Sequence, residues 1–215
     1  MRNFTKLITI FIIMLFSFES IAQMYQYKAR AGRYPNGSNN NLFSDARNWT
    51  NGSVPPNNAE IKMLGVNDTL VVDGVYTVDQ LVITKAGQYL MPSTAQDTLI
   101  LTGNGKTQMI QVNNANSRLF SYVPIAIKNT DGSGSRLIAT RGGNNGKIDI
   151  HAPIINESTH LVFCNPENKT GTQILIDAPM IGNKWLQIGS NANVTFGPNS
   201  DLSSHYSALR FMQQG

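Results

Sequence analysis

From residue 59 onward, hydrophobic and polar residues alternate with a period of two over short stretches separated by turn residues. Side chains on a β-strand point alternately to opposite faces, so this pattern predicts strands and not helices. The predicted strands span residues 60–64, 69–72, 75–78, 80–84, 98–102, 109–112, 125–128, 136–139, 147–150, 161–163, 173–176, 186–188 and 193–196. The chain is therefore predicted to be all-β.

A repeat near the C-terminus is the most regular part of this pattern. Residues 147–156 read KIDIHAPIIN and residues 173–182 read QILIDAPMIG, an offset of 26 positions. The offset places Ile148 on Ile174 and Ile154 on Met180. Repeats of this kind stack because one unit cannot bury its apolar face alone. We therefore expect a β-solenoid, with a β-sandwich as the alternative because sandwiches also contain short, evenly spaced strands.

The chain divides into three segments. Residues 59–215 are predicted to form roughly six solenoid coils of ~25 residues each. Residues 23–58 have no clean periodicity and end in Pro55-Pro56. This segment is predicted to be an irregular cap, because the first coil of a solenoid otherwise exposes its core and its strand edges.

Residues 1–22 have the features of a cleavable secretory signal. Arg2 and Lys6 precede an apolar run at 7–18, and Ser20 and Ala22 occupy the −3 and −1 positions of a cleavage site before Gln23. The run is shorter than the ~20 residues that a membrane span needs, although a retained anchor is the alternative. No other segment is apolar enough for a transmembrane helix, so we expect a secreted or cell-surface protein.

Composition excludes several classes of function. The formal net charge is +4, and no basic run or basic–aromatic cluster indicates nucleic-acid binding. Asparagine is frequent and often adjoins glycine, which is typical of turns with positive φ. A single cysteine, Cys164, excludes an internal disulfide and is expected to be buried and inert. Histidines are scattered, so we predict neither a metal site nor a cofactor.

Two stretches resemble a known group of proteins. Residues 48–55 (NWTNGSVP), followed by 59–61 and 69–73, resemble the opening of secreted surface proteins of Gram-negative bacteria that continue into a right-handed parallel β-helix. The repeats at 148–156 and 174–183 are similar to rungs of autotransporter-like and pectin-lyase-like β-helices. The resemblance implies a right-handed parallel β-helix. Because those proteins are much longer, it also implies an N-terminal or truncated portion.

The repeat also brings candidate catalytic residues together. If Ile148 and Ile150 point inward, Asp149 and His151 lie on the outer face beside Lys147, and the offset stacks Asp177 on His151. These groups could transfer protons or bind an acidic sugar. A solvated strand face with one ion pair explains the same residues.

Aromatic side chains are the candidates for stacking on sugars. We select Trp49, Trp185, Tyr76 and Tyr89 as candidate binding residues. For Trp49 the alternative is that the ring seals the end of the solenoid.

Two threonines are candidates for modification. Thr69 and Thr98 each lie in an Asp-Thr-Leu triplet, which resembles the short motif at which some Gram-negative bacteria attach O-glycans.

The expected function is that of a non-catalytic, adhesin-like β-helix whose polar flank binds glycans or another cell-surface component. A polysaccharide-active enzyme of the pectin-lyase-like type, or its N-terminal part, is the first alternative. A structural spacer or truncated gene product is the second. The open end of a solenoid exposes strand edges, so self-association through that end is also expected.

Overall fold

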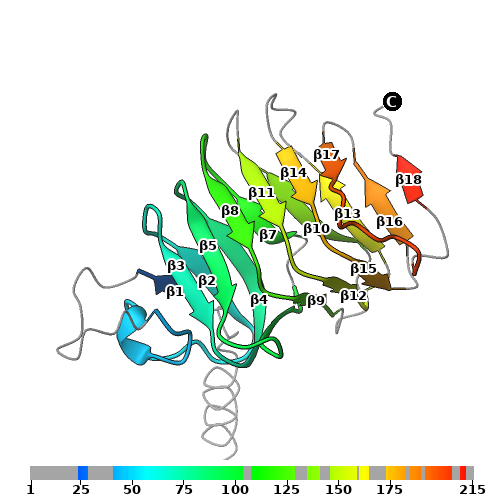
Figure 1. Cartoon of the computed structure of the whole chain (residues 1–215). Coiled ribbons are helices and arrows are strands. Elements are labelled where there is room, and N and C mark those ends of the chain that lie inside the picture. The colour runs from blue at the N-terminus through cyan, green and yellow to red at the C-terminus, as the bar shows by residue number, and fades with distance from the viewer. Residues whose placement is uncertain are drawn as a thin grey trace, which may run out of the picture.

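The computed structural model describes residues 24–28, 41–103, 108–128, 135–140, 146–158, 160–164, 173–182, 185–189, 192–204 and 209–211 (Figure 1). The strands are β1 (Met24–Tyr27), β2 (Ala59–Met63), β3 (Thr69–Val72), β4 (Val75–Ile83), β5 (Gln88–Pro92), β6 (Thr98–Leu101), β7 (Gln108–Val112), β8 (Arg118–Ser121), β9 (Ile125–Ile127), β10 (Ser135–Thr140), β11 (Lys147–Ile150), β12 (Ile154–Asn156), β13 (His160–Cys164), β14 (Gln173–Ile176), β15 (Met180–Gly182), β16 (Trp185–Ile188), β17 (Asn193–Phe196) and β18 (Leu209–Phe211). One 3-10 turn, η1 (Ala46–Asn48), precedes β2. The predicted signal at 1–22 lies outside the described residues.

The strands form two parallel sheets. A six-stranded sheet has the order β17-β14-β11-β8-β5-β3, and a 12-stranded sheet runs β15-β12-β9-β6-β4-β7-β10-β13-β16-β18, with β1 and β2 attached beside β4. All pairings between these strands are parallel. This confirms an all-β fold, and it is not the sandwich alternative, whose sheets are antiparallel.

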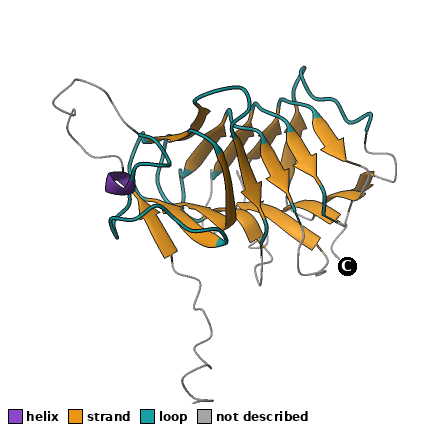
Figure 2. Ribbon diagram, turned by 90° about the horizontal axis from the view of Figure 1, so that it is seen from below, coloured by secondary structure: helices purple, strands orange, loops and turns teal. Residues whose placement is uncertain are grey.

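The chain visits three stacks of strands in a fixed order. It passes from the six-stranded sheet to the stack β6-β9-β12-β15 and then to the stack β7-β10-β13-β16. β4 is long enough to join the last two stacks, because residues 75–78 pair with β6 and residues 81–83 pair with β7. We call one strand from each stack, such as β11-β12-β13, a three-strand unit. Figures 1 and 2 show these units side by side along the length of the molecule.

The predicted 26-residue offset is confirmed by the register. β11 pairs with β14 so that Ile148 faces Ile174, and β12 pairs with β15 so that Ile154 faces Met180. All four side chains are buried. Apolar side chains from successive units thus form continuous inward columns between the stacks, and this removal of apolar surface from water is the main stabilising term.

Asparagine and glycine occupy turns that need a left-handed backbone. Asn58, Asn67 and Asn116 have φ values of 66°, 53° and 63°, and Gly87 has 65°. These residue types adopt positive φ at the lowest cost, which agrees with the turn assignment made from composition.

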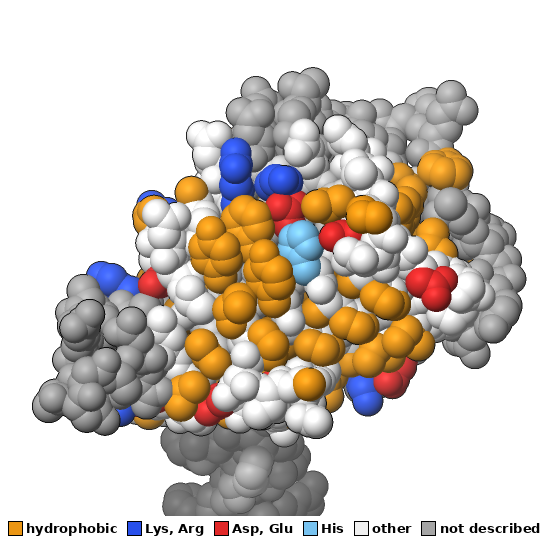
Figure 3. All heavy atoms as spheres, viewed as in Figure 1, with side chains coloured by type: hydrophobic (Ala, Val, Ile, Leu, Met, Phe, Trp, Pro, Cys, Tyr) orange, Lys and Arg blue, Asp and Glu red, His pale blue; other side chains and the backbone are white. Residues whose placement is uncertain are grey.

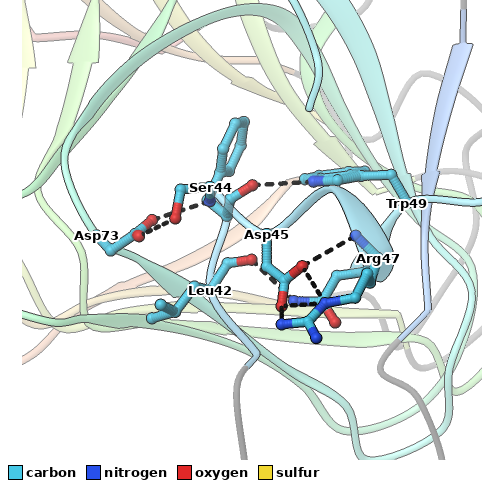
Figure 4. Close-up of polar contacts among 8 residues, drawn as sticks. Leu42, Ser44, Asp45, Arg47, Trp49 and Asp73 are labelled. Carbon is cyan, nitrogen blue, oxygen red and sulfur yellow. Dashed lines mark hydrogen bonds and ion pairs between the residues drawn. The ribbon is translucent and has the colours of Figure 1, made fainter. Parts of the chain in front are cut away.

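The N-terminal end is closed by an aromatic cluster. The Trp49 ring lies edge-on to Tyr27 (5.5 Å between centroids) and to Phe43 (5.0 Å), and Phe43 stacks on Tyr76 at 3.9 Å. The Trp49 indole N–H donates to the Phe43 carbonyl at 2.9 Å (Figure 4). The segment is less irregular than expected, because Met24–Tyr27 forms β1 and pairs with β2.

Candidate functional site: an aromatic and histidine face

The outer surface of the six-stranded sheet carries the candidate site. On β8, Leu119 and Ser121 are buried in the core, whereas Phe120 between them points outward. The parallel register then places outward positions of neighbouring strands side by side. We call the resulting surface the outer face; its members are Tyr89, Met91, Phe120, Tyr122, Asp149, His151, Leu175 and Asp177.

The outer face consists of two columns. In the first column, Tyr89 is paired with Phe120, Phe120 with Asp149, and Asp149 with Leu175. The second column lies one position beyond the strand ends, where the ladder continues through backbone hydrogen bonds from Tyr122 to Leu90, from His151 to Ser121 and from Asp177 to Ile150, each 2.8–2.9 Å long. This column runs Met91, Tyr122, His151, Asp177.

Rings stack along both columns. Tyr89 and Phe120 lie 4.9 Å apart with 13° between their planes, and Tyr122 and His151 lie 4.9 Å apart with 12°. The spacing follows from the ~4.8 Å separation of neighbouring strands. Tyr122 is 39% exposed and Met91 is 36% exposed. Figure 3 shows hydrophobic side chains gathered beside a histidine, with basic side chains at one edge and acidic ones nearby.

Two charged pairs border the rings. Lys147 Nζ lies 3.0 Å from Asp149 Oδ2, and His151 Nδ1 lies 3.6 Å from Asp177 Oδ2. The second separation is too long for a hydrogen bond, so it becomes an attraction only when the imidazole is protonated. Asp149 is buried, and its Oδ1 has no hydrogen-bond partner.

Asp177 is held as a carboxylate. The Asn199 backbone N–H donates to Asp177 Oδ1 at 3.0 Å and the Asn199 side-chain amide donates to Oδ2 at 3.2 Å. The backbone hydrogen bond is the largest cause that lowers the pKa of Asp177 below its ordinary value, and the neighbouring His151 adds to it. Asp177 therefore carries its negative charge at neutral pH and acts as an acceptor.

This geometry suits binding better than proton transfer. The Asp177 carboxylate is held ionised by its hydrogen-bond donors, so it is not a proton donor at neutral pH, and Asp149 is ion-paired with Lys147. Within the described ranges, no group of three or more His, Cys, Asp or Glu side chains could hold a metal ion. Flat rings bordered by acceptors and donors instead match a ligand with an apolar face and polar edges.

The other predicted binding residues lie elsewhere. Trp49 is only 3% exposed within the N-terminal cluster, so its selection for sugar contact is corrected: its ring presents no face to a ligand. Tyr76 stacks on Phe43 in the same cluster. Trp185 lies in the third stack, edge-on to His160 at 4.9 Å. Only Tyr89 joins the predicted residues Asp149, His151 and Asp177.

The two candidate O-glycan sites stay predictions. Thr69 and Thr98 are the first residues of β3 and β6 and are half-buried. The Thr98 hydroxyl donates to the Gln96 carbonyl at 3.3 Å. The two sites lie in different stacks, and Thr69 is the register partner of Tyr89 on the neighbouring strand.

Sequence reasoning missed Met91, Phe120 and Tyr122. The strands β5 and β8 were not predicted, because Gln88 and Ser121 are polar but buried, which breaks the expected alternation. Residues 118–121 read RLFS where their register partners 147–150 read KIDI, so the pattern gave no signal that places Phe120 beside Asp149.

No protein-family model, curated protein or solved structure matches the chain. In the part of the chain that the structure describes, there is no helix of the length and hydrophobicity that a membrane crossing requires.

Proposed function

We propose that this chain is a right-handed parallel β-helix protein that binds glycans, without catalysis, through the outer face. The fixed order of three stacks and the parallel register support the β-helix. Right-handedness is supported by the strong preference for right-handed connections between parallel strands of one sheet. The resemblance of residues 48–55 to Gram-negative surface proteins supports the same architecture.

One observation carries the glycan assignment: two stacked ring pairs lie side by side on one partly exposed surface. A pyranose presents C–H groups on its faces and hydroxyls at its edges. The exposed parts of the rings would pack against a C–H face. The Asp177 carboxylate would accept from hydroxyls.

Basic residues along one edge of the outer face favour glycans that carry a negative charge. Arg118 is the register partner of Lys147, and its backbone N–H donates to the Lys85 carbonyl at 3.3 Å. Three basic residues therefore follow one edge of the outer face, and of these three only Lys147 forms an ion pair within the described residues. We expect glycans with carboxylate or sulfate groups to bind more tightly, and added salt to reduce that advantage.

The test is binding of the purified chain to a panel of neutral and acidic polysaccharides in affinity gels. Phe120→Ala and Tyr122→Ala each remove one stacked ring and should weaken binding at least ~10-fold, which corresponds to ~1.4 kcal/mol. Val75→Ala is the matched control, because Val75 is 63% exposed and lies in the other sheet, where it pairs with Thr98. Binding that neither ring variant weakens, or no binding to any member, would refute the proposal.

We also propose export to the cell surface or the medium, which rests on the signal-like pattern of residues 1–22. The exported protein should begin at Gln23. N-terminal sequencing of the protein from its host would check this, and a retained Met1 would contradict it.

A polysaccharide-active enzyme is the second candidate, favoured by one feature. His151 is held between the Tyr122 ring and the Asp177 carboxylate, an arrangement that fixes an imidazole as a general base does. Cleavage of an acidic polysaccharide that disappears in both Asp149→Ala and His151→Ala would favour this candidate. Binding without cleavage would favour the first.

A further inference from the structure

The two ends of the stacked units differ. At the N-terminal end, residues 41–43 cover the edge of β3, because the Phe43 N–H donates to the Val71 carbonyl at 2.8 Å and the Val71 N–H donates to the Asn41 carbonyl at 2.9 Å. Tyr27, Phe43 and Trp49 fill the space above the core there and are all buried. The opposite end carries β17 and β18, which lie at the far side of the molecule in Figure 1.

Among the described residues, no strand covers the core at the β17–β18 end. One inward column of the third stack runs from Ile110 through Ile138, Phe163 and Ile188 to Phe211. The first three side chains of this column are 0% exposed, whereas Phe211 at its end is 73% exposed. An apolar residue at a core position therefore faces solvent.

In the six-stranded sheet, too, the inward side chains of the last strand are more exposed than those of the strand before it. Val194 and Phe196 on β17 stack on Ile174 and Ile176, which are 2% and 0% exposed. Val194 and Phe196 are only partly buried and pack against the core from its edge.

Two strand edges are open at the same end. Among the described strands, β17 pairs only with β14, and β18 pairs only with β16. β17 has the sequence NVTF, with neither a charged residue nor a proline to discourage pairing. Unprotected edges of this kind readily accept another strand. We call the β17 and β18 edges, with Val194, Phe196 and Phe211, the open end.

We infer that the open end pairs with the open end of a second copy of this chain. Within the chain, each earlier three-strand unit is covered by the next three-strand unit. A second copy offers a three-strand unit with the same open edges and the same uncovered side chains. The N-terminal cluster blocks the other end, so head-to-tail addition is prevented. A two-fold axis across the open end therefore gives a closed, isologous dimer in which β17 pairs antiparallel with its equivalent.

Sedimentation velocity of the purified chain over a concentration series tests this inference. The 23.6 kDa chain should sediment as a dimer. Phe211→Asp places a charge in the dimer core, and Thr195→Lys places one on the exposed side of the β17 edge; both should shift the equilibrium to monomer by at least ~10-fold. Val66→Asp adds the same charge to a 63% exposed valine in a turn and should leave the dimer intact.

Three results would overturn the inference. The wild-type chain could sediment as a monomer at every concentration, it could form filaments, or its dimer could persist in both open-end variants. Circular dichroism spectra of the variants that match the wild type show that loss of the dimer is not loss of the fold.

Discussion

Asp73 connects the N-terminal segment to the sheets through side-chain hydrogen bonds. Replacing Asp73 should change both the Tm and the pKa of Tyr76. Asp73 Oδ1 accepts hydrogen bonds from the Ser44 N–H at 3.1 Å and from the Tyr76 hydroxyl at 3.1 Å. Asp73 Oδ2 accepts one from the Ser44 hydroxyl, and Figure 4 shows the two contacts between Asp73 and Ser44. Burial and then the Asp73 charge raise the pKa of Tyr76 to about 12. Asp73→Asn removes the charge and keeps the shape.

The size of the effect follows from these contacts. A hydrogen bond to a charged group contributes ~1.5–3 kcal/mol. The two bonds from Ser44 are exposed, and the asparagine oxygen still accepts, so we expect a loss of about 1–3 kcal/mol in total. At roughly 2–4 °C per kcal/mol for a chain of this size, Tm should fall by about 2–12 °C.

The pKa of Tyr76 is the more specific readout. A raised pKa means that the folded state holds the phenol proton more tightly than the unfolded state. The associated stability is therefore complete below ~10 and is lost as pH rises toward 12. In Asp73→Asn the pKa should fall below about 12 but stay above ~10, because burial, its first cause, remains. In the variant, the stability that depends on the Tyr76 proton is therefore lost over a narrower range of pH than in the wild type.

Alkaline titration followed by tyrosinate absorbance measures this shift, and a thermal melt followed by circular dichroism measures the stability. Asp201→Asn is the matched control, since Asp201 accepts from the Ser203 N–H at 2.8 Å at the opposite end of the molecule. A late-titrating tyrosine that still ionises near 12 in Asp73→Asn, with an unchanged Tm, would show that Asp73 does not hold this end together.

Three further substitutions test the stacked architecture. Phe163→Ala truncates a side chain that is 0% exposed and should lower the free energy of unfolding, measured by urea denaturation, by ~3–5 kcal/mol. A substitution at a surface position would lower it by less than ~0.5 kcal/mol. Gly87→Ala adds a Cβ that overlaps Asn67 Oδ1 and lies 3.3 Å from its Cα, at a φ of +65°, so Tm should fall; an unchanged Tm would contradict the assigned turn. Asp177→Asn removes a carboxylate whose pKa is lowered, so the wild type should lose relative stability as pH falls below ~3.9, and the variant should lack that dependence. Parallel acid-unfolding curves for the two proteins would refute this assignment.

Much of the fold was predictable from one pair of repeats. The predicted alignment of Ile148 with Ile174 is the observed register, and the same offset brings Ile154 onto Met180 because the β11–β12 and β14–β15 connections have equal length. Other steps differ: Leu119 follows its partner Gln88 by 31 positions, and Asn193 follows Gln173 by 20. A single fixed period therefore does not describe the chain. The strands β5 and β8 were missed because the polar side chains of Gln88 and Ser121 point inward, so neither strand shows the expected alternation.

Whether a residue lies within the regular repeat also determined whether its place in the site could be predicted. Asp149, His151 and Asp177 lie within the regular repeat, so their neighbourhood followed from the offset. Phe120 and Tyr122 needed the register of β8, which the sequence alone did not reveal. Aromatic residues in the N-terminal segment were ambiguous for another reason: whether a large ring seals a core or faces solvent depends on contacts between distant segments.

The outer face and the open end follow from one property of stacked parallel strands. Inward positions must stay apolar at every level, since each side chain packs on the level before it. Outward positions carry no such constraint, so a ring or a charge repeated at one register position lies beside its neighbour at the strand spacing, as Tyr89 does with Phe120. Above the last level no further strand of the described residues is present, and Phe211 is exposed there. In the proposed dimer, the six-stranded sheets of two copies meet at β17, and each copy contributes one outer face. Two equivalent faces on one rigid body can engage one polymer together, and the second contact then forms at a high effective concentration. A repetitive ligand such as a polysaccharide is the class of partner that gains most from this arrangement.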